Sequence, residues 1–210
     1  MADAPDSLDD QARKADPDRW LSSRFVGDAQ ARADLIALYA FEAELMSIPT
    51  RVTQPLLAEM RYAWWREQMD GVFSGAERRG HPLLEALTEL VARHSLDRAP
   101  FEALIEAHID RVHGEPHDLD AFYVGPMQTA VRLLAGRGHD LVVADAARVR
   151  GLLQVGRRDE AAALRPAANR ALKTLPPVAF PAVAHAALAT DAAEPLKRLM
   201  LIWATLRGRI

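Results

Sequence analysis

The chain has 210 residues, and its 26 basic and 29 acidic side chains give a formal net charge of −3. Half of the residues are hydrophobic and none is cysteine, which excludes disulfide scaffolds, thiolate zinc sites, Fe–S clusters and cysteine nucleophiles. A slightly acidic chain is untypical of nucleic-acid binding, which usually needs a basic face, so no nucleic-acid partner is expected. The length and the apolar content predict one domain with a hydrophobic core.

Neither end of the chain has the pattern of an export or membrane-spanning segment. The first fifteen residues are polar and rich in aspartate, without the apolar run of a signal peptide. Apolar stretches such as Leu199 to Ala204 are far too short to span a bilayer. We therefore expect a cytoplasmic protein. Only three of the 26 basic residues are lysines, an arginine bias that indicates a GC-rich bacterial genome.

The first residues differ in composition from the rest of the chain. Residues 1–15 are small and polar and are expected to form a disordered tail, whereas residues 16–210 are expected to form one helical domain. Asp16 or Asp18 is a candidate cap for a short helix that runs through Phe25.

Almost all of the remaining chain has a helical pattern. Asp28 is the predicted cap of a longer helix whose apolar positions repeat with a helical period until Pro49, and a second long helix is predicted over residues 54–75. Further helices are predicted over 81–94, 99–112, 119–135, 140–155, 157–175 (bent or broken at Pro166), 180–189 and 194–207. No segment alternates with a period of two, so the predicted fold class is all-α, a single bundle of nine or ten helices.

The most specific strings lie in residues 16–75. Asp16–Trp20 reads DPDRW, Ala37–Phe41 reads ALYAF, and Glu59–Glu67 reads EMRYAWWRE. Periodicity alone fits two amphipathic core helices with a tryptophan pair at their contact. The strings, however, closely resemble the opening helices of the squalene/phytoene synthase family. The resemblance is strongest to a degenerate, non-classical branch that includes a mitochondrial assembly factor of respiratory complex I.

This resemblance implies an isoprenoid-synthase-like helical bundle with a central cavity, here in a shortened form. Active members of the family condense two prenyl diphosphates head to head. They use two aspartate clusters that face each other across the cavity and bridge Mg²⁺ to the diphosphate.

Both clusters are missing from this sequence. The positions that correspond to the first cluster, residues 46–50, read MSIPT, and the family's phosphate-binding arginine corresponds to Ala43. The paired aspartates of the second cluster are absent from the stretch 149–159. We therefore expect no catalytic residue, no metal site and no cofactor, with Mg²⁺ required only if the protein is a transferase after all.

The remaining polar groups give one further metal pattern, which is incomplete. Glu106, Asp110 and His113 share a helix face, but a carboxylate-bridged site needs a second Glu-x-x-His on another helix, and none is present. A solvated polar face is expected there.

Neighbouring residues on a helix point about 100° apart, so one of the two adjacent tryptophans is predicted to enter the core while the other faces a cavity or a partner. The candidates for cavity or partner binding are Tyr39, Glu44, Arg61, Trp64, Trp65 and Arg66.

The last predicted helix has two interpretations. Leu199–Trp203 is an apolar run, flanked by Lys197, Arg198, Arg207 and Arg209. This pattern fits a core-packing helix with a charged outer side, and it also fits a helix that lies in a membrane interface.

Three functions follow from the resemblance. The leading hypothesis is a non-catalytic family member that acts by binding, as an assembly or accessory factor for a membrane respiratory complex. The expected partners are then a respiratory-complex subunit or assembly intermediate, with peripheral contact at the inner membrane through the C-terminal helix. The alternatives are an active Mg²⁺-dependent prenyl diphosphate transferase with relocated carboxylates, and a scaffold that binds a prenyl lipid in the cavity.

Overall fold

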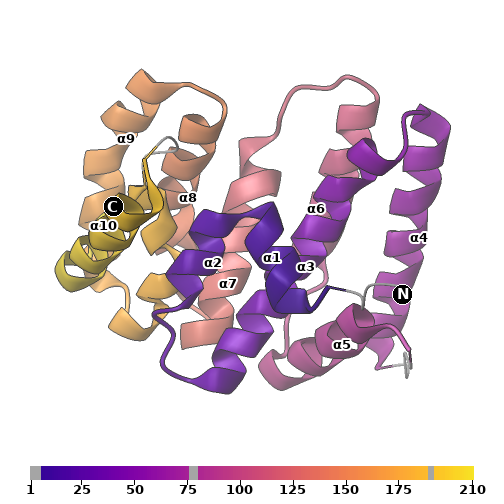
Figure 1. The fold of residues 1–210 in the computed structure, drawn as a ribbon, viewed down its shortest axis with the longest axis horizontal. Coiled ribbons are helices and arrows are strands. Elements are labelled where there is room, and N and C mark those ends of the chain that lie inside the picture. Colours follow the sequence, from indigo (N-terminus) through magenta and orange to yellow (C-terminus); the bar gives the residue numbers. More distant parts are fainter. Residues whose placement is uncertain (1–5, 76–79, 189–191) are drawn as a thin grey trace.

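The computed structural model describes residues 6–75, 80–188 and 192–210, and within these ranges the chain is helical without a strand (Figure 1). The all-α prediction is therefore confirmed. The α-helices are α1 (Leu8–Ala15), α2 (Pro17–Ser23), α3 (Ala29–Arg51), α4 (Pro55–Ser74), α5 (Pro82–His94), α6 (Ala99–Val112), α7 (Gly125–Ala135), α8 (Asp140–Gln154), α9 (Arg158–Ala171) and α10 (Glu194–Arg207). Four short π- or 3₁₀-helical segments join them: η1 (Asp120–Val124), η2 (Leu172–Thr174), η3 (Pro177–Ala182) and η4 (Ala184–Ala187).

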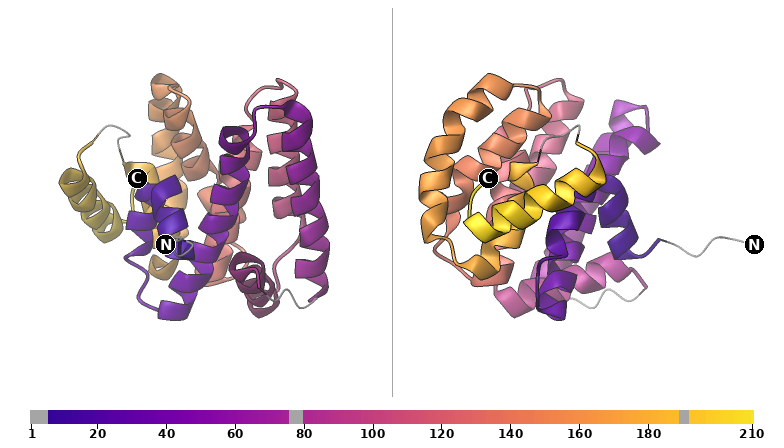
Figure 2. Two further views of the ribbon diagram at one scale, coloured as in Figure 1. Left: turned by 45° about the vertical axis from the view of Figure 1, so that its right-hand side comes forward. Right: turned by 60° about the vertical axis from the view of Figure 1, so that its left-hand side comes forward.

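Helix α3 lies in the core and connects two groups of helices. It packs against α1, α5 and α7, and most of its residues between Asp34 and Leu45 are buried. Helices α4, α5 and α6 pack together on one side, and α8 and α9 form the closest pair on the other (Figures 1 and 2). Helix α10 packs across η3, η4 and α2. None of the helices in the described ranges is long and apolar enough to cross a membrane.

Side-chain caps fix several helix ends where the sequence predicts them. The Asp16 carboxylate accepts hydrogen bonds from the backbone N–H groups of Asp18 and Arg19 at 3.1 and 3.0 Å, and so begins α2. Asp28 accepts from the N–H of Ala31 at 2.7 Å and begins α3. Helices α6 and α10 have the bounds that the sequence predicts.

The prediction that Pro49 ends its helix is wrong, because α3 continues to Arg51. Proline has no N–H to donate to the carbonyl four residues earlier, which belongs to Leu45. The hydroxyl of Tyr62 on α4 donates to that carbonyl instead, at 3.2 Å. A tertiary hydrogen bond thus replaces the one that Pro49 cannot make.

The prediction of a disordered tail is wrong for Leu8–Ala15, which form α1. Ala12 is buried, and the Asp9 carboxylate accepts hydrogen bonds from Trp20 Nε1 at 2.8 Å and from Arg32 Nη2 at 2.6 Å. These contacts hold α1 against α2 and α3. Residues 1–5 lie outside the described ranges, and the single domain over 16–210 stays a prediction.

Two other predicted helices have a different form. The helix predicted over 119–135 begins as the π-helical η1, in which the Gly125 N–H bonds to the Asp120 carbonyl. The helix predicted over 180–189 is replaced by the 3₁₀ segments η3 and η4, where prolines at 176, 177 and 181 remove α-helical hydrogen bonds. Residue 189 lies outside the described ranges. Helix α9 continues through Pro166 without a break.

Candidate functional site

A central cavity of about 660 Å³ lies among helices from both halves of the fold. Its wall contains side chains of α1, α2, α3, α6, η1, α7, α8, η4 and α10. The polar lining residues are Asp16, Asp18, Arg19, Glu42, His108, Arg111, His117, Tyr123, Arg150, Gln154, His185 and Lys197. Apolar groups, among them Met46, Phe122 and Met127, cover the rest of the wall.

The two buried carboxylates of this cavity are both held in ion pairs. Asp18 binds Lys197 Nζ at 2.7 Å and Arg150 Nη2 at 3.1 Å. Glu42 binds Arg19 through both guanidinium nitrogens, with Nη2 at 2.8 Å from Oε1. The third lining carboxylate, Asp16, caps α2 and lies 3.8 Å from Arg150 Nη2. Each acid of the wall therefore already has a cationic neighbour.

Arg19 is the centre of the second ion pair and also covers an aromatic ring. Its guanidinium lies 3.9 Å above the ring centroid of Tyr39, a cation–π contact. Burial alone would lower the pKa of Arg19, but the Glu42 carboxylate outweighs burial and raises it. Burial raises the pKa of Tyr39 to about 12. Arg19 is thus charged and Tyr39 neutral near pH 7.

Several buried polar atoms in or near this cavity have no hydrogen-bond partner among the described residues: Arg150 Nη1, His185 Nδ1, His117 Nε2 and the hydroxyl of Tyr39. Arg150 and His185 are each only 3 % exposed. An unsatisfied buried polar group costs about 1–3 kcal/mol. A ligand with acceptor oxygens would remove that cost at Arg150.

The histidines of the wall are neutral near pH 7. Burial lowers the pKa of His108 to about 4 and the pKa of His185 well below its usual value of 6.5. Burial also lowers the pKa of His117. The charge of the cavity near neutral pH therefore comes from its arginines, its lysine and its three carboxylates.

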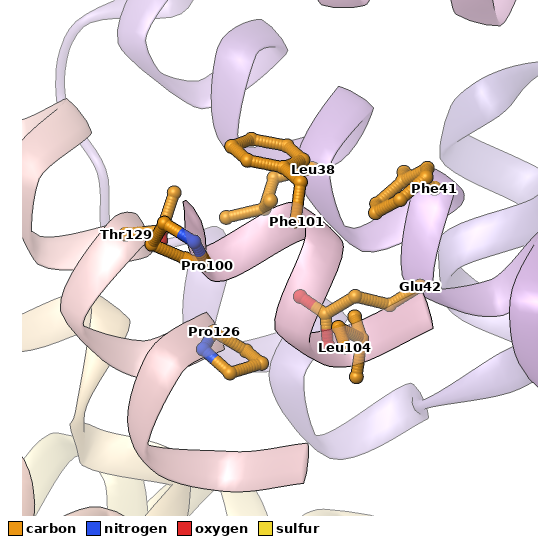
Figure 3. A pocket seen from close by; sticks show the side chains of 8 residues that line it. All are labelled: Leu38, Phe41, Glu42, Pro100, Phe101, Leu104, Pro126 and Thr129. Carbon is orange, nitrogen blue, oxygen red and sulfur yellow. The ribbon is translucent and has the colours of Figure 1, made fainter. Parts of the chain in front are cut away.

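Glu42 also borders a second, very small pocket (Figure 3). This pocket has a volume of about 10 Å³ and is lined mainly by apolar side chains of α3, α6 and α7. That volume is roughly the space for one water molecule, so the pocket is a packing gap and not a ligand site.

A separate groove of about 520 Å³ runs between α3, α4 and the start of α5, and it brings together four of the six predicted candidates. These are Glu44, Arg61, Trp64 and Trp65. Glu44 pairs with Arg51 at 3.0 Å. Trp65 is 4 % exposed and packs edge-on against Phe41, whereas Trp64 is 41 % exposed, so the two rings divide between core and surface as their spacing predicts. We call this surface the α4 groove.

The other two candidates lie elsewhere. Tyr39 is buried under Arg19, and Arg66 pairs with Glu106 on α6. Because Glu106 is paired with Arg66, it does not form a site together with Asp110 and His113. Within the described ranges, no three His, Asp or Glu side chains are grouped so that they could hold a metal ion.

Sequence reasoning missed most of the central cavity. Asp18 and Arg19 lie within the DPDRW string, which carries the resemblance but whose side chains show no pairing pattern in the sequence. Their partners Glu42, Arg150 and Lys197 are 23, 132 and 179 residues away from them. No local spacing reveals contacts over such separations.

A family model described as squalene/phytoene synthase matches residues 12–124, which is more than half of the chain and includes α2, α3, α4, α5 and α6. No curated protein and no solved structure matched the chain.

Proposed function

We propose that the chain, which belongs to the squalene/phytoene synthase family, is a non-catalytic member of that family and acts by binding. The observation that carries this proposal is the pairing of the cavity's carboxylates. Asp18 and Glu42 are each bound to guanidinium or ammonium groups of the cavity wall. Neither is available to bridge a metal ion to a diphosphate.

The residues at the positions of the family's aspartate clusters also support the non-catalytic proposal. Met46 and Pro49, from the stretch that corresponds to the first cluster, line the cavity with apolar groups. Arg150, Gln154 and Val155, from the second stretch, line it with a cation, an amide and an alkyl group. Mg²⁺ requires several oxygen ligands in an octahedral arrangement, and these side chains do not supply them.

Recruiting Glu42 as a metal ligand would carry a large cost. It would leave the Arg19 guanidinium buried without its counter-ion, and breaking a buried pair in this way costs about 3–5 kcal/mol. The cavity therefore does not fit a resident Mg²⁺ ion.

The α4 groove supports a role in protein binding. Leu57, Met60 and Trp64 are exposed apolar side chains of α4 that line the groove, beside the ion pair of Glu44 and Arg51. Apolar surface with a central tryptophan and a charged rim is the usual composition of a protein interface. We assign this surface to a subunit or assembly intermediate of a membrane respiratory complex, so that the protein acts as an assembly or accessory factor.

The first test concerns catalysis. The purified protein is incubated with farnesyl or geranylgeranyl diphosphate and Mg²⁺, beside an active synthase of the family as the positive control. We expect neither condensed product nor released pyrophosphate. Formation of either by the wild-type protein would refute the non-catalytic proposal and favour a transferase with relocated carboxylates.

The second test concerns the partner. The tagged protein is isolated from its host cells under mild conditions, and bound proteins are identified by mass spectrometry. Subunits of a respiratory complex are expected with wild type and with the control L141A, which removes an exposed leucine on α8, but not with W64A in the α4 groove. A monomer that carries no such subunit would contradict the assembly role.

The unpartnered donors of the central cavity favour a second candidate, a scaffold for a prenyl lipid with an anionic head. Arg150 Nη1 and His185 Nδ1 would bind the head, and the apolar wall around Met46 and Phe122 would contact the chain. Organic extraction of the purified protein should then yield a bound isoprenoid. An extract without one would contradict this candidate.

A further inference from the structure

Helix α10 has an apolar stripe on its outer face. The stripe consists of five large side chains, of which Leu206 is 78 % exposed and the others about half exposed: Leu196, Leu199, Ile202, Trp203 and Leu206. At 100° per residue these positions fall within about one third of the helix circumference. The stripe is therefore continuous along the whole helix.

The opposite face of α10 already makes the contacts that hold the helix to the protein. Leu201 and Ala204 are buried, and Lys197 reaches Asp18 in the central cavity. After the helix, Ile210 is bonded through its backbone to the side-chain amide of Asn169 on α9, at 2.8 and 3.0 Å. In the right-hand view of Figure 2, α10 (yellow) crosses the outside of the molecule. Core packing thus does not account for the stripe.

Arginines lie along both edges of the stripe. Arg207, on one edge, covers the ring of Trp203 at 4.5 Å, and Arg198, on the other, pairs with Glu194 at 2.5 Å. Arg209 lies two residues beyond the end of the helix. The chain as a whole carries a net charge of −3, whereas this helix carries a net positive charge.

We propose that α10 docks on the surface of a membrane that contains anionic lipid. The stripe would enter the boundary between head groups and acyl chains, and the arginines at its edges would contact lipid phosphates. A tryptophan with a neighbouring arginine suits this boundary, because each has an apolar body and a polar end. This inference does not rest on the non-catalytic proposal, nor on the partner of the α4 groove.

The charges favour this occupant over a second copy of the chain. A two-fold interface brings the same patch of both copies together, and here it would oppose arginine-edged stripes of the same sign. An anionic lipid surface complements them.

The test is co-sedimentation of the full chain with vesicles of phosphatidylcholine, with and without phosphatidylglycerol. We expect binding to the mixed vesicles and at least tenfold weaker binding to phosphatidylcholine alone. L206E, which places a charge on the exposed stripe, should reduce binding about tenfold or more. Its matched control L141E places the same charge at a leucine on α8 that is 90 % exposed, and should bind like wild type.

The arginine edges are tested with the double variant R198Q/R207Q. One basic side chain near an anionic surface is worth about fivefold in binding, so the double variant should bind about 25-fold more weakly. Circular dichroism of each variant confirms that α10 is still folded. The proposal is overturned if the wild-type protein does not bind the anionic vesicles, or if folded L206E binds them as well as wild type does. A solution dimer that L206E dissociates, without vesicle binding, would instead assign the stripe to a second copy.

Discussion

At the scale of single residues, the buried ion pairs determine what the central cavity can bind. Asp18 joins Arg150 of α8 to Lys197 of α10, and Glu42 joins α3 to Arg19 of α2. These pairs use the cavity's acids to hold its walls together. Arg150 nevertheless keeps one unpaired nitrogen, so the wall presents a donor and no free carboxylate.

The Arg19–Glu42 pair should contribute strongly to stability. E42Q removes the carboxylate and leaves the Arg19 charge buried, so we expect the free energy of unfolding to fall by about 3–5 kcal/mol. The matched control is E44Q, which breaks the more exposed pair with Arg51 and should cost no more than about 1 kcal/mol. Urea denaturation measures both. Equal losses in the two variants would show that the buried pair contributes no more to the free energy of unfolding than the exposed pair.

Gly151 on α8 is required for packing against η1. A Cβ atom at this position would lie 2.6 Å from Tyr123 Cδ2 and 3.1 Å from Leu119 Cδ2. G151A should therefore destabilise the fold by about 1–3 kcal/mol, although alanine favours helix. The control is G27A, where nothing lies within 4 Å of the added Cβ. If G151A and G27A have the same melting temperature in thermal unfolding, this packing argument is contradicted.

His108 should make stability fall in mild acid. Burial lowers its pKa to about 4, so between pH 6.5 and pH 4 the unfolded chain binds a proton that the folded chain does not. Stability is then fully present above pH 6.5 and decreases as the pH falls, by about 2 kcal/mol between pH 7 and pH 5 from this group.

The test compares denaturant unfolding at pH 7 and pH 5. H108F removes the titrating ring, which stacks on Tyr62 and lies edge-on to Phe122, so its loss of stability between the two pH values should be smaller by about 2 kcal/mol. H113Q changes a histidine whose side chain is 56 % exposed, and it should keep the wild-type difference. If H108F and wild type lose the same stability, another group causes the acid sensitivity.

At the scale of elements, periodicity and caps predicted most helices close to their observed bounds. One error has a tertiary cause and another comes from local prolines. Ala99–Val112 needs only its own pattern to be recognised as a helix. The end of α3 depends on the Tyr62 hydroxyl, which lies on another helix, and no local pattern around Pro49 contains it. The 3₁₀ form of η3 follows from its prolines, whose effect the apolar pattern alone does not show.

The attachment of helix α1 should contribute to the stability of the fold. Asp9 accepts hydrogen bonds from Trp20 and Arg32, so D9A should lower the free energy of unfolding by about 1–3 kcal/mol. The control D10A removes a neighbouring carboxylate whose contacts are with the exposed Ser7, and it should cost less than about 1 kcal/mol. A loss no larger for D9A than for D10A would mean that α1 is only loosely attached.

At the scale of the whole molecule, four of the six candidate residues named from the sequence lie together in the α4 groove, whereas the ion pairs of the central cavity could not be predicted. Glu44, Arg61, Trp64 and Trp65 come from two consecutive helices, so their proximity follows from local order along the chain. The cavity needs Arg150 and Lys197 from distant helices, and only the complete packing of the bundle brings them to Asp18.

Because seven α-helices and two short segments build the central cavity, a ligand inside it binds only the folded chain and must stabilise it. Without Mg²⁺, geranylgeranyl diphosphate at 100 times its Kd should raise the Tm by about 5–10 °C. R150Q removes the unpaired donor and should lose most of this increase, measured against its own ligand-free Tm. R148Q, which removes an arginine two positions away that pairs with Asp120 outside the cavity, should keep it. An increase that is retained in R150Q would place the ligand elsewhere, and one that appears only with Mg²⁺ would mean that a metal ion holds the diphosphate after all.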